Sequence, residues 1–236
     1  MIPLRIQCQG RPVRNLFQEA AAEPAANSAQ TRGTALLLPG AYYSSQAPGM
    51  HFLRETLLRA GFDTLAIDYH YFLAGEPYSE ASRTQALAEA EAAYLHLVGR
   101  ADSSRDRGPR SERFLIAGKS LGSILAVRLA LDHRASMETD LVLLTPVEAR
   151  IAALFAQSSS PADARTRPWR LFAVRCAPDE ARDEAAWKTV VPAFREVTEV
   201  SLARTTHGMD SLDGPAASLH GLARMCTDLE RWLSLP

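Results

Sequence analysis

The five residues Gly118-Lys119-Ser120-Leu121-Gly122 place a serine between two glycines, each two positions away from it. A serine hydroxyl can attack a carbonyl carbon when a sharp strand-to-helix turn exposes it, and glycines at these two positions let the strand and the helix pass close together. The apolar runs 114–117 and 124–131 predict a buried strand before the turn and a buried helix after it. The spacing alone also occurs in ordinary turns, but in this context Ser120 is a candidate nucleophile for acyl transfer.

A serine nucleophile needs a base to take its proton, and the base needs an acidic partner that fixes its tautomer. Of the six histidines, His207 is the one that we expect in a loop after the final strand, where it could reach over Ser120 or remain an exposed surface residue. Asp179, three residues after a strand predicted to end at 176, is our first choice for the acid, although it could instead cap the next helix. The other candidate acids are Glu180, Asp183 and Glu148.

Acyl transfer also needs two backbone N–H groups that stabilise the negative oxygen of the tetrahedral intermediate. We expect one from Leu121 and the other from Ala41, with Tyr42 as the alternative to Ala41. Tyr42 and Tyr43 could line a substrate pocket or could be ordinary packing aromatics. Lys119 could favour anionic substrates or lower the pKa of the base, or it could point into solvent.

The elements that would position these residues are short apolar strands separated by helices. Strands are predicted at 4–8, 13–17, 34–38, 62–69, 114–117, 141–144, 169–176 and 197–203, and helices at 50–60, 82–98, 124–131, 148–155, 180–195 and 215–233. This alternation predicts an α/β protein with a mostly parallel central sheet and helices on both faces. The first two strands lie too close for a helical crossover, so we expect an antiparallel edge. Chemistry is expected just after the strands, because ligands of such sheets bind beyond the carboxyl ends.

Bulk properties indicate one domain over residues 1–236, with a surface loop at 19–33 and a short lid-like insertion at 146–167 that is too small for a cap domain. The net charge of −1 gives no global field that favours nucleic acid or an anionic membrane. The three cysteines form no C-x-x-C pair, and no apolar run approaches the roughly 20 residues that span a bilayer. We therefore expect a cytoplasmic monomer or homodimer with reduced thiols, and neither a metal nor a nucleotide site.

The chain resembles the α/β-hydrolase family in the order Ser120, Asp179, His207, in the glycine-flanked serine turn and in the position of the Pro39-Gly40-Ala41 loop, and this resemblance covers nearly the whole chain. The compact size further resembles its dienelactone-hydrolase-like members. The resemblance implies a serine hydrolase without cofactor or large cap. It departs from the family at Pro39, where a histidine is usual, and at Lys119, where many esterases carry His, Asp or Glu.

We therefore expect cleavage of a small carboxylic ester or thioester through an acyl-enzyme on Ser120. Hydrolysis of an amide or a C–C bond would use the same residues. The alternative from a different class is a non-catalytic scaffold that binds a small molecule or a protein. The distance between His207 and Ser120 distinguishes the two, because a scaffold need not keep them within hydrogen-bond reach.

Overall fold

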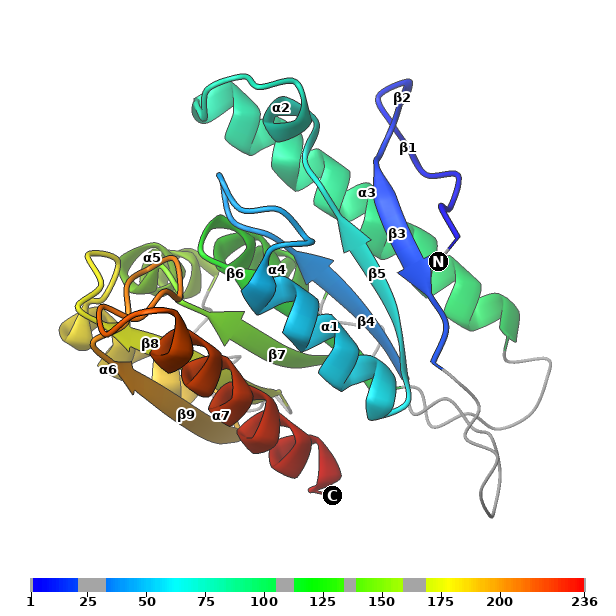
Figure 1. The fold of residues 1–236 in the computed structure, drawn as a ribbon. Helices are drawn as coiled ribbons and strands as arrows, with labels where there is room; N and C mark the ends of the chain where they lie inside the picture. Colours follow the sequence, from blue (N-terminus) through cyan, green and yellow to red (C-terminus); the bar gives the residue numbers. More distant parts are fainter. Residues whose placement is uncertain (1, 21–32, 105–112, 134–138, 159–168, 236) are drawn as a thin grey trace, which may run out of the picture.

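A seven-stranded sheet runs through the part of the chain that the structure describes (Figure 1). The computed structural model describes residues 2–20, 33–104, 113–133, 139–158 and 169–235, with 101–104 described by their backbone alone. The strands follow the spatial order β3-β5-β4-β6-β7-β8-β9. They are β3 (Asn15–Gln18), β4 (Gly33–Leu38), β5 (Phe62–Ile67), β6 (Arg113–Lys119), β7 (Thr139–Leu144), β8 (Arg170–Ala177) and β9 (Glu196–Ala203). All neighbouring pairs are parallel except β3 with β5, which confirms the predicted sheet and its antiparallel edge.

Helices cover both faces of this sheet, as predicted. Helices α1 (Pro48–Arg59) and α7 (Pro215–Ser234) pack side by side on the face turned towards the viewer in Figure 1. The opposite face carries α3 (Glu80–Ser104), α4 (Leu121–Asp132), α5 (Glu148–Ser158) and α6 (Glu184–Val190). A short helix, α2 (His70–Leu73), follows β5.

Strand β4 shows why both faces are covered. Leu36 and Leu38 belong to the apolar core on the α3–α6 side, whereas Ala35 and Leu37 belong to the core under α1 and α7. All four side chains are fully buried. A continuous apolar run of this kind is typical of parallel strands that are buried on both sides.

The amino-terminal segment differs from the prediction. The predicted strands 4–8 and 13–17 are joined by the hydrogen bond from the Val13 N–H to the Ile6 carbonyl oxygen (2.9 Å), but they form no regular ladder over their predicted lengths. The regular pairing lies at the turn between them, where β1 (Gln7–Cys8) and β2 (Arg11–Pro12) form a small antiparallel hairpin outside the main sheet. The segment after it, β3, pairs with β5 at the edge of the main sheet.

Two predicted helix boundaries were also wrong. Helix α3 was predicted to end at Gly99 but continues to Ser104. A glycine ends a helix when its backbone adopts the left-handed conformation, and Gly99 does not adopt it, so this glycine only weakens the helix, by about 1 kcal/mol. The helix predicted from 180 begins only at Glu184, where the Asp183 side chain accepts a hydrogen bond from the Ala186 N–H. The residues before it form the turn that presents Asp179.

Residues 146–167 were predicted to form a lid-like insertion, but most of their described part, 146–158, is helix α5, which belongs to the domain core. Helix α5 packs against α4 and α6, and its residues Ile151 and Phe155 are buried in the core. Residues 159–168 lie outside the described residues, as does most of the predicted 19–33 surface loop.

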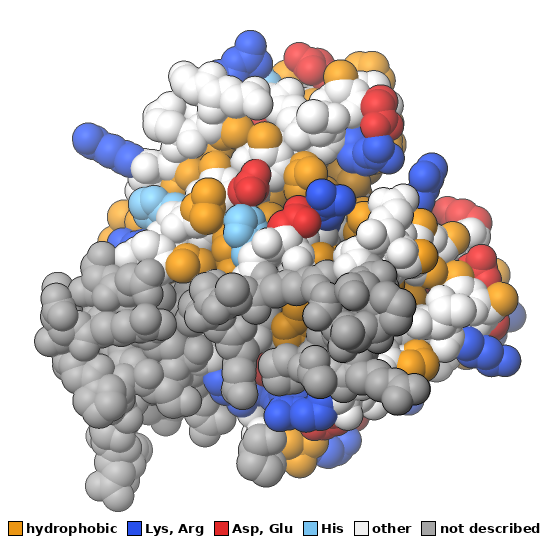
Figure 2. Space-filling view, turned by 180° about the vertical axis from the view of Figure 1, so that it is seen from behind, with side chains coloured by type: hydrophobic (Ala, Val, Ile, Leu, Met, Phe, Trp, Pro, Cys, Tyr) orange, Lys and Arg blue, Asp and Glu red, His pale blue; other side chains and the backbone are white. Residues whose placement is uncertain are grey.

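The described surface carries charges of both signs. Figure 2 shows the α3–α6 face, where basic and acidic side chains are interspersed among apolar ones. No helix in the described part of the chain is both long and apolar enough to cross a lipid bilayer.

Candidate active site

Ser120 lies at the sharp turn between β6 and α4. Its φ of 52° is in the left-handed region, which residues with side chains rarely adopt. The Ser120 N–H donates to the Leu144 carbonyl oxygen of the neighbouring strand (3.0 Å), and the Ser120 carbonyl oxygen accepts from both the N–H (2.9 Å) and the hydroxyl (2.6 Å) of Ser123. These bonds offset the cost of the strained backbone and fix the serine at the carboxyl end of β6.

Glycine is required around this turn for steric reasons. A Cβ added to Gly118 would lie 2.1 Å from the Gly122 carbonyl oxygen, closer than any real contact. A Cβ on Gly40, in the loop after β4, would lie 3.4 Å from the Cβ of Ser120. The loop that was predicted to supply an oxyanion donor therefore passes directly beside the candidate nucleophile.

The structure brings the three predicted triad residues together. His207, in the loop after β9, has its Nε2 2.7 Å from the Ser120 Oγ and its Nδ1 2.8 Å from an Asp179 carboxylate oxygen. With the imidazole neutral and its proton on Nδ1, His207 donates to Asp179 and accepts the serine O–H. The Asp179 side chain is 3% exposed and that of His207 is 23% exposed. The acid is thus shielded from water, while the base remains accessible from the sheet edge.

Of the four candidate acids, Asp179 is the one that contacts His207. Its carboxylate also accepts the Ala181 N–H (2.9 Å), which fixes its orientation. Asp183 caps α6, and Glu180 is exposed. Glu148 is buried and forms an ion pair with Arg175 (2.6 Å), so its role is structural.

The loop after β4 is held by two tyrosines that sequence analysis did not single out. The hydroxyl of Tyr69 donates to the Pro39 carbonyl oxygen (3.1 Å), and that of Tyr71 donates to the Ala41 carbonyl oxygen (2.8 Å). Burial raises the pKa of both phenols, so they remain donors well above neutral pH. The sequence did offer a signal for this role, because Tyr69 and Tyr71 lie at and just after the end of a predicted strand and the hydroxyl of a buried tyrosine usually makes a hydrogen bond.

A second residue that sequence analysis missed is Asp68, at the end of β5. It accepts hydrogen bonds from the Ser45 N–H (2.7 Å) and the Ser45 hydroxyl (3.0 Å). These bonds fix the chain between the oxyanion-loop candidates and α1. An acid directly after a buried strand was the signal for it.

Lys119 does not point into solvent, which was one of the predicted alternatives. It is 2% exposed, so it neither points into solvent nor presents its charge at an open surface. Its ammonium donates to the His207 carbonyl oxygen (2.9 Å) and the Thr145 hydroxyl (3.3 Å) and lies 4.3 Å from the centre of the Tyr43 ring. A direct substrate contact by Lys119 is therefore not supported.

The two predicted pocket tyrosines have different surroundings. Tyr42 is 69% exposed, and its hydroxyl accepts the Tyr78 N–H (3.1 Å). Tyr43 is partly buried, and its hydroxyl accepts the Gly49 N–H at the start of α1 (2.9 Å). Burial raises the pKa of the Tyr43 phenol. Tyr43 thus forms part of the wall beside the site, whereas Tyr42 lies on the surface.

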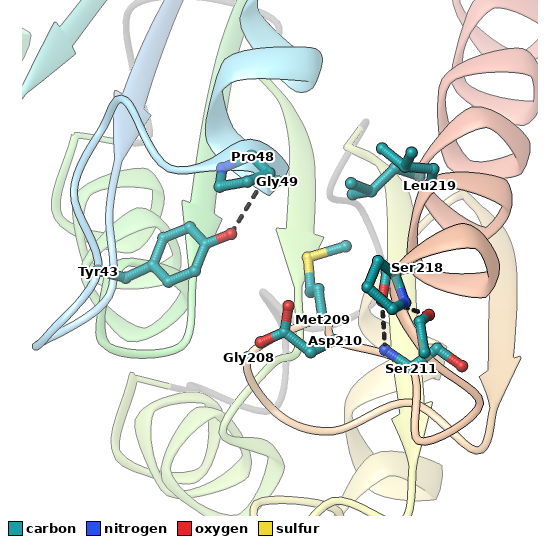
Figure 3. Close-up of a pocket in the computed structure, with 12 residues that line it drawn as sticks. Tyr43, Pro48, Gly49, Gly208, Met209, Asp210, Ser211, Ser218 and Leu219 are labelled. Atoms are coloured by element: carbon teal, nitrogen blue, oxygen red, sulfur yellow. Dashed lines mark hydrogen bonds between the residues drawn. The ribbon is translucent and has the colours of Figure 1, made fainter.

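A cavity of about 460 Å³ opens between the amino-terminal ends of α1 and α7 (Figure 3). Tyr43 and Gly49 form one wall, Leu219 of α7 lies on the other, and the Met209 side chain projects between them. Gly208, which directly follows His207, also lines this cavity. The lining is mostly apolar, and it begins one residue away from the candidate base.

Neither the known protein-family models nor the curated proteins match this sequence. Solved structures do match over nearly its whole length. Est1E from Butyrivibrio proteoclasticus with bound ferulic acid is 15% identical, covers 98% of this chain and 97% of its own, and has a TM-score of 0.66. A Xanthomonas campestris protein described as an α/β serine hydrolase without lid is also 15% identical, with coverage of 100% and 96% and a TM-score of 0.64. A serine hydrolase homologue from Coxiella burnetii has 14% identity, coverage of 99% and 97%, and a TM-score of 0.66.

The chain has the α/β-hydrolase fold. Within this fold, the predicted site residues follow the carboxyl ends of four strands: Ala41 after β4, Ser120 after β6, Asp179 after β8 and His207 after β9. Pro39 stands where we expected a histidine from the family resemblance, and its carbonyl oxygen accepts a hydrogen bond from the Tyr69 hydroxyl. Among the described residues, no three His, Cys, Asp or Glu side chains are grouped closely enough to hold a metal ion.

Proposed function

We propose that this chain is a serine hydrolase that cleaves a small carboxylic ester or thioester through an acyl-enzyme on Ser120. The observation that carries the proposal is the pair of short contacts made by the His207 ring, 2.7 Å to the Ser120 Oγ and 2.8 Å to Asp179. In a neutral imidazole one nitrogen accepts while the other donates, so this arrangement leaves Nε2 ready to take the serine proton. The same geometry supports Asp179 as the residue that stabilises the imidazolium that forms.

The proposed reaction has two halves. In the first, the Ser120 Oγ attacks the ester carbonyl carbon while its proton moves to the His207 Nε2. The carbon–oxygen bond to the leaving group then breaks as Nε2 gives its proton to the leaving oxygen. In the second half, His207 takes a proton from water, the resulting hydroxide attacks the acyl carbon, and the proton returns to Ser120 as the acid product leaves.

The negative oxygen of each tetrahedral intermediate needs N–H donors. Leu121 is the first residue of α4, and the first N–H groups of a helix have no partner within the helix. We propose its N–H as one donor and the Ala41 N–H as the other, with that of Tyr42 as the alternative. The Tyr69 and Tyr71 hydroxyls hold the carbonyl oxygens on both sides of Gly40, which supports a preorganised loop.

The cavity beside Gly208 supports a substrate with a compact apolar group. Its volume of about 460 Å³ lies within the range of small-molecule pockets, about 300–1,000 Å³. Because His207 must return its proton to the leaving oxygen, the leaving group has to lie beside this histidine. We propose that the cavity receives the apolar part of the leaving group. The ferulic acid bound to Est1E, a structural neighbour, is a small carboxylic acid and so corresponds to the acyl part of such an ester, not to its leaving group.

The short contact between His207 and Ser120 is also what favours an enzyme over the scaffold alternative. A scaffold has no need to keep a nucleophile, a base and an acid in contact, and the strained backbone of Ser120 would bring it no benefit. The three cysteines are free thiols, which supports a cytoplasmic location for this hydrolase.

The proposed function is tested with a fluorophosphonate probe and a panel of p-nitrophenyl and thiol esters of graded acyl length. We expect the probe to label Ser120, and we expect Ser120→Ala and His207→Ala to abolish both labelling and turnover while circular dichroism shows them folded. Equal turnover by wild type and Ser120→Ala would overturn the proposal. So would an unlabelled Ser120 in folded wild-type protein.

A further inference from the structure

Lys119 is one of only two lysines in the sequence, it directly precedes the candidate nucleophile, and its side chain is buried. The other, Lys188, is exposed on α6. Buried ammonium groups are rare unless a carboxylate pairs with them, because removal of the charge from water is costly. Among the described residues, no carboxylate lies within 4.0 Å of the Lys119 nitrogen; its contacts are neutral oxygens and a ring face. This placement requires an explanation other than an ion pair.

The neutral contacts of Lys119 come from the ends of different strands. Lys119 is the last residue of β6, Thr145 follows β7, His207 follows β9, and Tyr43 lies in the loop after β4. These are the loops that must converge on Ser120. The ammonium therefore lies at the point where the nucleophile strand, the histidine loop and the oxyanion-loop candidate meet.

The bond to His207 is made to its backbone, not to its ring. The Lys119 Nζ donates to the His207 carbonyl oxygen at 2.9 Å, while the imidazole of the same residue faces Ser120 and Asp179. A charged donor makes a hydrogen bond about twice as strong as a neutral one. The loop also has its own backbone bonds, from Thr206 N–H to Asp210 and from Met209 N–H to Thr206 (both 2.9 Å), and its Thr205 N–H donates to the Ala177 carbonyl oxygen at the end of β8 (3.0 Å). Lys119 adds a bond between the backbone of that loop and β6, the strand that carries the nucleophile.

The surroundings of the ammonium also determine its protonation. Burial lowers the pKa of Lys119 to about 8, and the more distant Cys176 thiol and the Asp179 and Asp210 carboxylates partly oppose this shift. Besides these groups, the Tyr43 ring lies against the ammonium. The lysine is therefore charged at neutral pH and loses its proton within the range in which an esterase can be assayed.

We propose that Lys119 is a positioning residue, whose charged amine holds the His207 loop so that the imidazole reaches both Ser120 and Asp179. This inference rests on the proposed hydrolase function and extends it to a residue that does not touch the substrate. Lys119 acts through the backbone of His207, and Thr145 supports it from the neighbouring strand. The amine would still donate when neutral, but it would then hold the loop more weakly.

The first test compares Lys119→Met with the matched surface control Lys188→Met. Methionine fills a similar volume but removes both the charge and the donor. We expect Lys119→Met to lose on the order of 100-fold in kcat, because a small misplacement of a catalytic group has that effect, with KM nearly unchanged. Lys188→Met keeps wild-type kinetics. Amide hydrogen exchange between Thr205 and Leu212 should be faster in Lys119→Met only.

The second test is the pH profile of kcat. If Lys119 only filled space in the core, its protonation would not change this profile. We expect wild type to lose activity as the pH rises past about 8, where Lys119 loses its proton. Lys119→Arg, which stays charged, should recover part of the activity and keep it to higher pH, whereas Lys119→Met should show no such alkaline decline. Wild-type kcat and an unchanged profile in Lys119→Met would overturn the proposal. If Lys119→Met does not fold, Lys119→Arg decides the question. The proposal is overturned if the kcat of Lys119→Arg falls above pH 8 in the same way as that of wild type.

The two proposals fail in distinguishable ways. If Ser120 of the wild type is not labelled by the fluorophosphonate, the hydrolase function fails, and hydrogen exchange alone decides whether Lys119 holds the loop. If Ser120 is labelled equally fast in wild type and in Lys119→Met, the hydrolase stands and the positioning role of Lys119 is wrong.

Discussion

Gly122 and Leu38 are in such close contact that a Cβ added to the glycine would stand 1.9 Å from the leucine carbonyl oxygen. The same Cβ would lie 2.7 Å from the Pro39 carbonyl oxygen. The start of α4 therefore passes directly against the end of β4, not only against its own strand. This contact sets the distance between the nucleophile turn and the loop that we propose as an oxyanion donor.

Gly122→Ala is expected to destabilise the fold by about 3 kcal/mol or more, because the alanine methyl would meet backbone atoms that cannot rotate away. Gly99→Ala is the matched control. Among the residues that the structure describes, its Cβ would meet nothing within 4 Å, so replacing a glycine inside α3 should stabilise by roughly 0.5–1 kcal/mol. Urea unfolding followed by circular dichroism measures both. Equal stability of Gly122→Ala and wild type would contradict the steric explanation.

The sequence predicted the sheet, and the strand ends at which Ser120, Asp179 and His207 lie, because both depend on local patterns. Buried strands between helices are visible as short apolar runs, and a carboxyl-end residue can be located once the strands are placed. Ser120, Asp179 and His207 each follow a predicted strand, so the edge on which they meet was implied by the topology.

The environment of Lys119 could not be predicted in the same way. Its burial depends on Tyr43, Thr145 and His207, which are far from it in sequence. No periodicity encodes contacts between loops, and a lysine after a strand is usually exposed. The buried pair of Glu148 with Arg175 was missed for the same reason, and Glu148 remained a candidate acid although it serves packing. Sequence patterns therefore located the strand ends but not the contacts between them.

Asp179→Asn is expected to lower kcat by about 1,000- to 10,000-fold, because an amide cannot hold the imidazole in the required tautomer or stabilise its charge. Asp183→Asn is the control, since asparagine caps a helix as well as aspartate does and Asp183 makes no contact with His207. Steady-state kinetics on the best ester of the panel compare the two. A similar loss in both variants would argue against Asp179 as the orienting acid.

The cavity predicts a selective effect of Leu219→Asn. Leu219 lines it from α7, so a polar side chain there should raise KM about tenfold for esters with a bulky apolar leaving group and leave methyl and ethyl esters unaffected. Leu95→Asn offers the matched control, because Leu95 is a similarly exposed helical leucine on α3, on the other face of the sheet. If both variants respond alike across the panel, the leaving group does not occupy this cavity.

The pH dependence of stability gives an independent measure of the burial of Lys119. Burial lowers its pKa from 10.5 to about 8 in the folded protein, so between these values the unfolded chain binds more protons than the folded one. The contribution of Lys119 to the free energy of unfolding therefore rises as the pH increases from about 8 to 10.5, by at most about 1.4 kcal/mol per pH unit. Lys119→Met has no such group, and the buried tyrosines lose stability at high pH in both proteins. We expect the difference in unfolding free energy, wild type minus Lys119→Met, to increase from pH 8 to pH 10 in urea titrations. A constant difference over this range would mean that the ammonium is solvated and not buried.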